Sequence, residues 1–390
     1  MAKSAKRIYM DYASTTPVDP AVFSAMKPYF SEEFANPSAL YREAVAAKKA
    51  VENARASLAK QIGAHPDEII FTGSGTESVN LAILGTLGGQ KITSKPHLVM
   101  TVIEHPAVLE AAAAAAWYGS KISQVTVSET GLIDPKDIKK AITPDTVLVS
   151  VMYANNEIGT IQPIHEVAKI VRHARKERSS TLPYFHTDAS QAANYLDIHV
   201  DRLGVDLMTL DGSKIYGPKG IGILYARRGV PLRPIIFGGG QERSLRSGTE
   251  NVALIVGIAR ALEITTKIKE KESKRLTKIR DYCISEIKKN FPDTLVNGDE
   301  DKRLPNNVNV CFPKLDSEFL VLSLDAQRIM ASAATACLNI GDQNSSYVIE
   351  ATGRKECAAS SLRFTFGRGT KKSDITALIK ALKNAIALQS

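Results

Sequence analysis

The stretch "LDGSKIYGPKGIGILY", residues 210–225, joins two apolar runs through a turn that holds a lysine. Lys214 follows the apolar run "DLMTL", and Gly217, Pro218 and Gly220 come shortly after it. Glycine and proline in this arrangement predict a tight turn. An ammonium group at the end of an interior strand is either an ordinary surface lysine or a functional group, and the rest of the chain decides between these two interpretations.

Apolar runs alternate with helix-like segments from about residue 68 to residue 226. The strand-like runs are "EIIFTG", "HLVMTV", "TVLVSVMYA", "YFHTD", "VDLMTL" and "GIGILYA", and the helix-like segments are "TESVNLAILGTLG", "PAVLEAAAAAAWYG", "IHEVAKIVRHARKE" and "ASQAANYL". Apolar strands separated by amphipathic helices predict a mostly parallel sheet that is covered on both faces. Ligands of such sheets bind at the carboxyl ends of the strands.

The length of 390 residues exceeds what one hydrophobic core usually supports, so we expect a large domain and a smaller companion. A long helical stretch, from about residue 250 to residue 275, is the expected connector. After it the pattern changes to "NNVNVCF", "LVLSL" and a final helix "KSDITALIKALKNAIAL", which indicates an α+β unit.

Charge and hydropathy exclude some classes of function. The net charge is +9, but the densest basic segment, "TKIKEKESKRLTKIR", mixes lysine, glutamate and arginine at helical spacing, which is typical of a solvated helix face. We therefore expect no direct nucleic-acid binding. No apolar run approaches the roughly 18 residues of a membrane span, and the first residues lack the apolar core of a secretory signal, so we expect no membrane association and a cytoplasmic location.

The four cysteines, Cys283, Cys311, Cys337 and Cys357, form no CxxC pair and show no metal-ligand spacing. We therefore expect neither a metal site nor a disulfide framework. Cys283 and Cys311 lie in apolar periodic segments and are predicted to pack in the core. Cys337 lies in "MASAATACLNIGDQNSS", which predicts an exposed loop, where a thiol is either incidental or reactive.

Polar residues follow each strand-like run of the predicted sheet. They are the turn "SGTES" with Ser74 and Thr76, His105, the amides Asn155 and Asn156, Asp188 with Gln191, and Lys214. Each has a structural explanation of its own, such as a helix N-cap. Together they supply a phosphate cradle, an aromatic ring, an amide, a carboxylate and a lysine, which is the set that pyridoxal phosphate chemistry needs.

The chain resembles the cysteine desulfurases, which belong to the class V, aspartate-aminotransferase-like group of pyridoxal-phosphate enzymes. The stretches that carry the resemblance are "YMDYASTTPVDPAV", "FANPSALYREA", "EIIFTGSGTESVNLAI", "EHPAVLE", "NNEIGTIQPI", "HTDASQAANYLDI", "GSKIYGPKGIGILY", "GGGQERSLRSGTEN", "ATAC" and "SSLRFTFGRGT". It implies the α/β fold type I of these transferases, with a mostly parallel seven-stranded sheet. It also implies a large cofactor domain at residues 17–260 and a small domain, formed by residues 1–16 and 261–390, that carries the mobile loop with the catalytic cysteine.

The resemblance implies a role for each matched position. Lys214 would hold the cofactor through a Schiff base, Asp188 would face the pyridine nitrogen, and Gln191 would bond the ring hydroxyl. His105 would stack on the ring. The residues implied to bind the phosphate are Gly75 with Thr76, Ser213 in place of the usual histidine, and Thr249, which reaches the cofactor of the other subunit, so that a homodimer is implied.

The implied reaction takes sulfur from L-cysteine and leaves L-alanine. Arg363, assisted by Asn156, would bind the substrate carboxylate, a task that suits a bidentate guanidinium. Cys337 would accept the sulfur as a persulfide and pass it to an acceptor protein, such as an iron–sulfur scaffold or a relay protein of tRNA thiolation. A flexible polar loop suits a thiol that must visit both the cofactor and an acceptor.

The chain departs from the family next to the lysine, where Ser-Gly-His-Lys is usual and this sequence has Asp211, Gly212, Ser213 and Lys214. A carboxylate near a phosphate dianion is repulsive, on the order of 1 kcal/mol or more at about 4 Å. Either Asp211 turns away and pairs with a cation, or cofactor affinity is reduced, and we expect weaker cofactor retention. Tyr41 and Ala44, where the family has histidine and glycine, and the altered segment around the loop cysteine are smaller departures.

Three alternatives stay open at this point. A selenocysteine lyase would use the same residues, and another class V enzyme would perform transamination or β-elimination. Cys337 favours sulfur transfer, because transamination needs no loop thiol. A degenerate relative that acts as a binding or regulatory partner is favoured by the altered phosphate pair and disfavoured by the presence of the other site residues.

Overall fold

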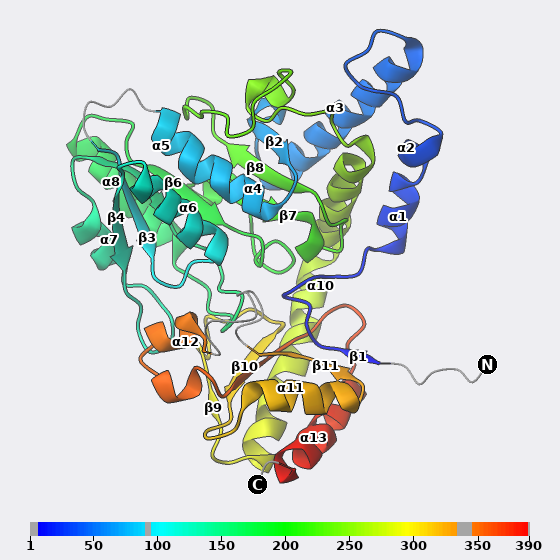
Figure 1. Cartoon of the computed structure of the whole chain (residues 1–390), viewed down its shortest axis with the longest axis vertical. Coiled ribbons are helices and arrows are strands. Elements are labelled where there is room, and N and C mark those ends of the chain that lie inside the picture. The colour runs from blue at the N-terminus through cyan, green and yellow to red at the C-terminus, as the bar shows by residue number, and fades with distance from the viewer. Residues whose placement is uncertain (1–6, 90–94, 334–344, 389–390) are drawn as a thin grey trace.

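The computed structural model describes residues 7–89, 95–333 and 345–388. The strands of its central sheet are, in chain order, β2 (Ile69–Thr72), β3 (His97–Thr101), β4 (Lys121–Val125), β5 (Thr146–Ser150), β6 (Tyr184–Asp188), β7 (Leu207–Asp211) and β8 (Gly222–Ala226). Their order in the sheet is β2-β8-β7-β6-β5-β3-β4 (Figure 1). All neighbours are parallel except β8, which is antiparallel to both β2 and β7. The expected mostly parallel seven-stranded sheet is therefore confirmed.

The edge strand β4 was not among the predicted strands. Its sequence, "KISQV", is mostly exposed or half-buried, whereas β3, β5 and most of β7 are fully buried. A strand at the edge of a sheet needs no continuous apolar run. The apolar pattern therefore identifies the interior strands and misses this one.

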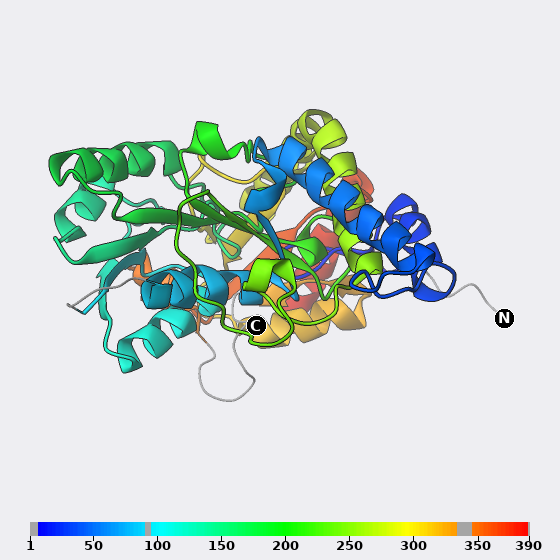
Figure 2. The same cartoon turned by 90° about the horizontal axis from the view of Figure 1, so that it is seen from above.

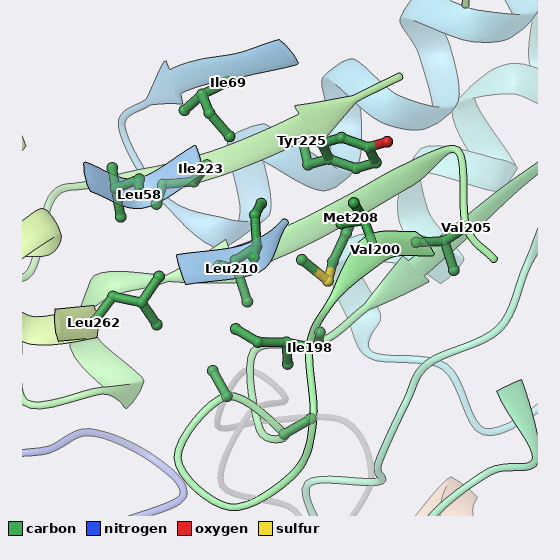
Figure 3. Packing of buried hydrophobic residues seen from close by; sticks show 14 of the residues in the cluster. Leu58, Ile69, Ile198, Val200, Val205, Met208, Leu210, Ile223, Tyr225 and Leu262 are labelled. Atoms are coloured by element: carbon green, nitrogen blue, oxygen red, sulfur yellow. The ribbon is translucent and has the colours of Figure 1, made fainter. Parts of the chain in front are cut away.

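Helices cover both faces of the sheet (Figure 2). One face carries α3 (Arg42–Ile62), α7 (Pro135–Ala141), α8 (Ile164–Glu177) and α10 (Val252–Asn290), and the other carries α4 (Gly75–Asn80), η2 (Leu81–Gly85), α5 (Thr86–Gly89) and α6 (Pro106–Trp117). Successive strand side chains alternate between these layers: Ile223 and Tyr225 pack on the first face and Leu224 on the second. Figure 3 shows Ile223 and Leu210 near Leu58 of α3 and Leu262 of α10.

The segment "ASQAANYL", which the sequence analysis predicted to be a helix, forms turns instead. Asp188 Oδ1 accepts the Ser190 N–H at 2.9 Å, and Asn194 Nδ2 donates to the Lys214 carbonyl at 2.6 Å. These side-chain bonds replace the regular helical pattern. A helix of the β6–β7 connection comes later, at α9 (Val200–Leu203).

The long helix α10 joins two hydrophobic cores. Ile258 and Leu262 pack in the core under the central sheet, and Leu276 and Cys283 pack in a second core. The helix reaches Asn290, well beyond the expected end near residue 275, because apolar residues at helical spacing continue to face the core, as the buried Leu276, Cys283 and Ile287 show.

The second core lies below the central sheet in Figure 1. A four-stranded antiparallel sheet has the order β12 (Ser332–Ala333), β13 (Ser361–Thr365), β10 (Asn307–Cys311) and β9 (Leu295–Val296). Beside it β1 (Ile8–Tyr9) pairs in parallel with β11 (Ile329–Met330). The helices of this region are α11 (Ser317–Ala326), α12 (Tyr347–Ala351), the short turn η5 (Lys355–Cys357) and α13 (Lys372–Ala387).

The remaining short helices belong to the part of the molecule that contains the seven-stranded sheet. They are α1 (Pro20–Met26), α2 (Pro28–Ser31), η1 (Pro66–Glu68), η3 (Gly212–Lys214) and η4 (Glu242–Ser244). None of the helices in the described ranges is long and apolar enough to cross a membrane.

Cys311 and Cys357 form a disulfide, which corrects the expectation that no disulfide occurs and that Cys311 is a free core thiol. The two residues are 46 positions apart, so sequence spacing could not reveal the pair. The antiparallel pairing of β10 with β13 sets Cys311 opposite Ser361, just beyond the turn that holds Cys357. Cys283 is a buried free thiol, as predicted. Cys337 lies outside the described residues.

Candidate active site

A cavity of about 200 Å³ lies between the carboxyl ends of the central strands and Arg363 of the second sheet. The predicted site residues that line it are Gly75, Thr76, His105, Asn156, Asp188, Gln191, Lys214 and Arg363. Parallel strands end at one edge of the sheet, which is why residues spread over much of the chain converge here. The functional interpretation of the strand-end lysine is therefore favoured over that of a surface lysine.

Lys214 and Asp188 come from neighbouring parallel strands. Asp188 ends β6, and Lys214 lies in the turn η3 directly after β7. The Lys214 ammonium donates to the Ser14 carbonyl, and Asp188 Oδ1 accepts the Ser190 N–H at 2.9 Å. The structure thus fixes a primary amine and a carboxylate in one cavity.

His105 is the N-cap of α6, where its Nδ1 accepts the Ala107 N–H at 3.1 Å. This hydrogen bond requires an unprotonated Nδ1, so the ring carries its proton on Nε2. Burial lowers the pKa of His105, while the charge of Asp188 raises it against that effect. A neutral imidazole therefore faces the cavity.

Arg363 lies on β13 in the second sheet and is almost completely buried. Its Nη1 donates to the Asn156 carbonyl at 3.0 Å, and its Nη2 donates to Asp11 Oδ1 and Ser14 Oγ at 2.9 and 2.8 Å. Within the described ranges, Arg363 Nε and Asn156 Oδ1 are buried polar atoms without a partner. Buried polar atoms of this kind are uncommon in folded proteins and can serve a ligand.

Asp211 also lines the cavity, and its carboxylate does not turn away. Oδ2 accepts the Gly75 N–H at 2.9 Å, and Oδ1 accepts the Ser213 N–H and hydroxyl at 2.7 and 2.5 Å. No ion pair with a lysine or arginine forms at Asp211 in the part of the chain that the structure describes. The expected alternative in which Asp211 pairs with a cation is therefore wrong.

Two other predicted residues, Ser213 and Thr249, do not line the cavity of their own chain. Ser213 contacts it only through Asp211. Thr249 lines a separate cavity of about 220 Å³, together with Gly73 and Arg246. Cys337 lies outside the described residues.

The sequence analysis missed the polar residues that support the cavity. Asp11 and Ser14 hold Arg363, although the segment "YMDYAST" was noticed for its resemblance alone. Glu104 and Glu157 are fully buried, and burial raises their pKa values to about 8 and about 7. The signal that could have found Glu104 is the one used for its neighbours, a polar residue directly after an apolar run, whereas Glu157 follows Asn155 and Asn156.

Residues 8–378 match the family model of the class V aminotransferases. The chain belongs to this family. The cysteine desulfurase IscS of Dictyoglomus turgidum is 42% identical over 381 residues, which cover 98% of this chain and 95% of that relative. The structure of a NifS-like protein superposes with a TM-score of 0.90 at 33% identity and covers 98% of this chain and 100% of that one. The structure of SspA in complex with cysteine gives 0.77 at 34% identity, with 92% and 98% covered.

Class V aminotransferases are pyridoxal-phosphate enzymes, and the residues present fit this cofactor. A lysine amine and a carboxylate share the cavity, as aldehyde binding and pyridine binding require. The Gly75 N–H points into the cavity from the start of α4, and Asp211 already satisfies it as an anion would. The cavity of this class V aminotransferase therefore has the groups that bind pyridoxal phosphate. It also has the Asp211 carboxylate at the N–H group that would bind the phosphate.

Proposed function

We propose that the chain is a cysteine desulfurase that takes sulfur from L-cysteine and leaves L-alanine, with the persulfide formed on Cys337. The observation that carries the proposal is the convergence of Lys214, Asp188, His105 and Arg363 in one cavity. The relatives named cysteine desulfurase IscS and the SspA structure with cysteine support the choice of substrate.

Pyridoxal phosphate, when bound, supplies an aldehyde and a ring that accepts electrons. Lys214 would hold it covalently and Asp188 would face its pyridine nitrogen. Gln191 would bond the ring hydroxyl and His105 would stack on the ring. Gly75 and Thr76 would bind the phosphate, together with Ser213 once its donors are released from Asp211.

Arg363 and Asn156 bind the carboxylate of L-cysteine, and the buried position of Arg363 keeps water from competing for it. Once the substrate amine has replaced it, the free Lys214 amine would take the proton from the substrate Cα. The Cys337 thiolate would bond to the substrate sulfur as the Cβ–S bond breaks. A proton would then add at Cβ and Lys214 would return a proton to Cα, which leaves alanine and a persulfide on Cys337. The role of Cys337 rests on its sequence alone, since it lies outside the described residues.

The functional unit in this proposal is a homodimer. Exposed apolar side chains gather near the start of α3 and the loop before η4: Phe34, Leu40, Tyr41 and Phe237. Residues 37–38 and 239–243 line one cavity, so the two segments lie together. A surface of this kind marks a protein contact. Thr249, which does not reach the cavity of its own chain, would serve the cofactor of the other subunit.

The finer assignments are part of the same proposal. Residues 17–260 form the cofactor domain, and residues 1–16 and 261–390 form the small domain. An iron–sulfur scaffold or a relay protein of tRNA thiolation receives the sulfur, in the cytoplasm.

The test is a visible spectrum of the purified protein with added pyridoxal phosphate, before and after L-cysteine. Borohydride should fix the cofactor to Lys214, as peptide mass spectrometry would show, and Lys214→Ala should abolish this product. Cys337→Ala should bind the cofactor normally and release no sulfide with reductant. Undiminished sulfide release from Cys337→Ala would disprove the persulfide route and favour another class V reaction, and no cofactor spectrum at all would favour a binding protein.

A further inference from the structure

Asp211 and the turn that opens α4 approach each other across a single residue of β8. Gly222 pairs with Thr72 at the end of β2 and with Asp211 at the end of β7. A Cβ atom added to Gly222 would lie 2.4 Å from the Ser74 carbonyl group. Because glycine has no Cβ, the turn at residues 73–75 can fold over β8 toward Asp211.

The Asp211 carboxylate uses the hydrogen-bond donors that a phosphate would need. Gly75 donates its N–H to Oδ2 at 2.9 Å, from the first turn of a helical segment that continues through η2 and α5 to Gly89. Ser213 donates its N–H and its hydroxyl to Oδ1 at 2.7 and 2.5 Å. The backbone N–H at the helix start and the hydroxyl that replaces the usual histidine are therefore both engaged by one side chain.

No lysine or arginine forms an ion pair with this carboxylate in the described ranges, although Lys214 lines the same cavity. Arg246 lies near the turn, and its Nη2 would be 3.4 Å from a Cβ at Gly73. Arg246 forms an ion pair with Glu77, with Nε 2.8 Å from Oε1. An incoming phosphate therefore meets a carboxylate whose two oxygens already accept hydrogen bonds.

We propose that Asp211 is a built-in competitor of the cofactor phosphate, and that it lowers the preference of this site for phosphorylated over unphosphorylated pyridoxal-type ligands. The inference rests on the proposed function, since it concerns the same cavity. A phosphate must displace the carboxylate from the Gly75 N–H, whereas a hydroxymethyl group carries no charge for Asp211 to repel. Asp211 is thus a specificity-determining residue, which acts at the phosphate end of the site.

The test compares pyridoxamine 5′-phosphate with pyridoxamine, which differ only in the phosphate and carry no aldehyde to react with Lys214. Dissociation constants are measured by fluorescence titration for the full-length protein, for Asp211→Ser and for the shape-matched Asp211→Asn. The quantity compared is the dissociation constant of pyridoxamine divided by that of pyridoxamine 5′-phosphate. We expect this ratio to rise about tenfold in Asp211→Ser, which corresponds to about 1.4 kcal/mol. Asp137→Asn, on the surface helix α7, removes the same charge away from the cavity and should leave the ratio unchanged.

Inorganic phosphate gives a second measurement that needs no cofactor. It should raise the melting temperature of Asp211→Ser and leave that of the unmodified protein unchanged. A change in the ratio below about threefold in both variants would overturn the proposal. The proposal would also be overturned if the unmodified protein bound pyridoxamine 5′-phosphate much more tightly than pyridoxamine. Failure of borohydride to fix pyridoxal phosphate at Lys214 would instead overturn the proposed function, together with this inference.

Discussion

Arg363 Nη2 lies 2.9 Å from Asp11 Oδ1, and this ion pair joins β13 to the segment that follows β1. The arginine side chain is 1% exposed and the aspartate side chain 19% exposed. A second bond, from Nη1 to the Asn156 carbonyl, ties the guanidinium to the loop after β5. The guanidinium is therefore fixed between the two sheets before any substrate arrives, which reduces the entropy lost on binding.

Arg363→Lys should lower kcat/KM for L-cysteine on the order of 100-fold, mainly through KM. Lysine keeps the charge but loses the planar fork that a carboxylate accepts, and a hydrogen bond to a charged group contributes about 1.5–3 kcal/mol. Steady-state kinetics measure the effect, and the cofactor absorbance should stay unchanged. Arg354→Lys, at a half-buried arginine that bonds the Val296 carbonyl, is the matched control. Equal kcat/KM values for Arg363→Lys and the unmodified protein would exclude Arg363 as the carboxylate ligand.

Glu104 should make the stability of the fold depend on pH. Burial raises its pKa to about 8, although Oε1 accepts hydrogen bonds from Thr101 and Met152. The unfolded carboxyl titrates near about 4.3, so between these values the folded state binds one proton more than the unfolded state. The free energy of unfolding then falls by about 1.4 kcal/mol for each pH unit from this group.

Glu104→Gln removes that dependence. The free energy of unfolding of both proteins is measured by urea denaturation at each pH. The value for Glu104→Gln minus the value for the unmodified protein should rise from about pH 5 to about pH 8 and stay constant above that. Glu110→Gln, at an exposed glutamate on α6, should show no such trend. Parallel stability curves for Glu104→Gln and the unmodified protein would mean that Glu104 ionises normally in the fold.

The sequence predicts the interior of the sheet well because buried strands are continuous apolar runs. It also predicts that the polar residues at the strand ends, such as His105, Asp188 and Lys214, meet in one cavity, since strand ends of a parallel sheet share one edge. The predicted Ser213 and Thr249 do not line it. It does not predict the Asp211–Gly75 contact, because this contact spans 136 positions and depends on the missing Cβ of Gly222. The segment after Asp188 was wrongly expected to be helical, because side-chain bonds to the backbone compete with local propensity.

The Cys311–Cys357 disulfide predicts a count of reactive thiols. The chain has four cysteines, and these two are completely buried. In denaturant without reductant, alkylation followed by intact mass measurement should find two modified thiols for each chain, assigned to Cys283 and Cys337. Prior reduction should raise the number to four. Full alkylation without reductant would show that the pair is not bonded in the purified protein.

Phe237→Asp should convert the proposed homodimer into a monomer. The Phe237 side chain is 81% exposed, and burying a phenylalanine contributes about 1.5–3 kcal/mol. A two-fold interface uses the same residue twice, so the dissociation constant should rise on the order of 100-fold or more. Sedimentation velocity over a range of concentrations measures this change. Trp117→Asp, at a tryptophan that is 84% exposed on α6, is the matched control and should stay dimeric.

The same variant also tests the assignment of Thr249. Since Thr249 lines a cavity separate from the one that holds Lys214, a monomer would lack its contribution to the phosphate. Phe237→Asp should therefore retain pyridoxal phosphate less well on dilution than Trp117→Asp does, as absorbance after gel filtration would report. A monomeric Phe237→Asp that retains the cofactor as firmly as the dimer would show that each subunit completes its own phosphate site, and the role of Thr249 across the interface would be wrong.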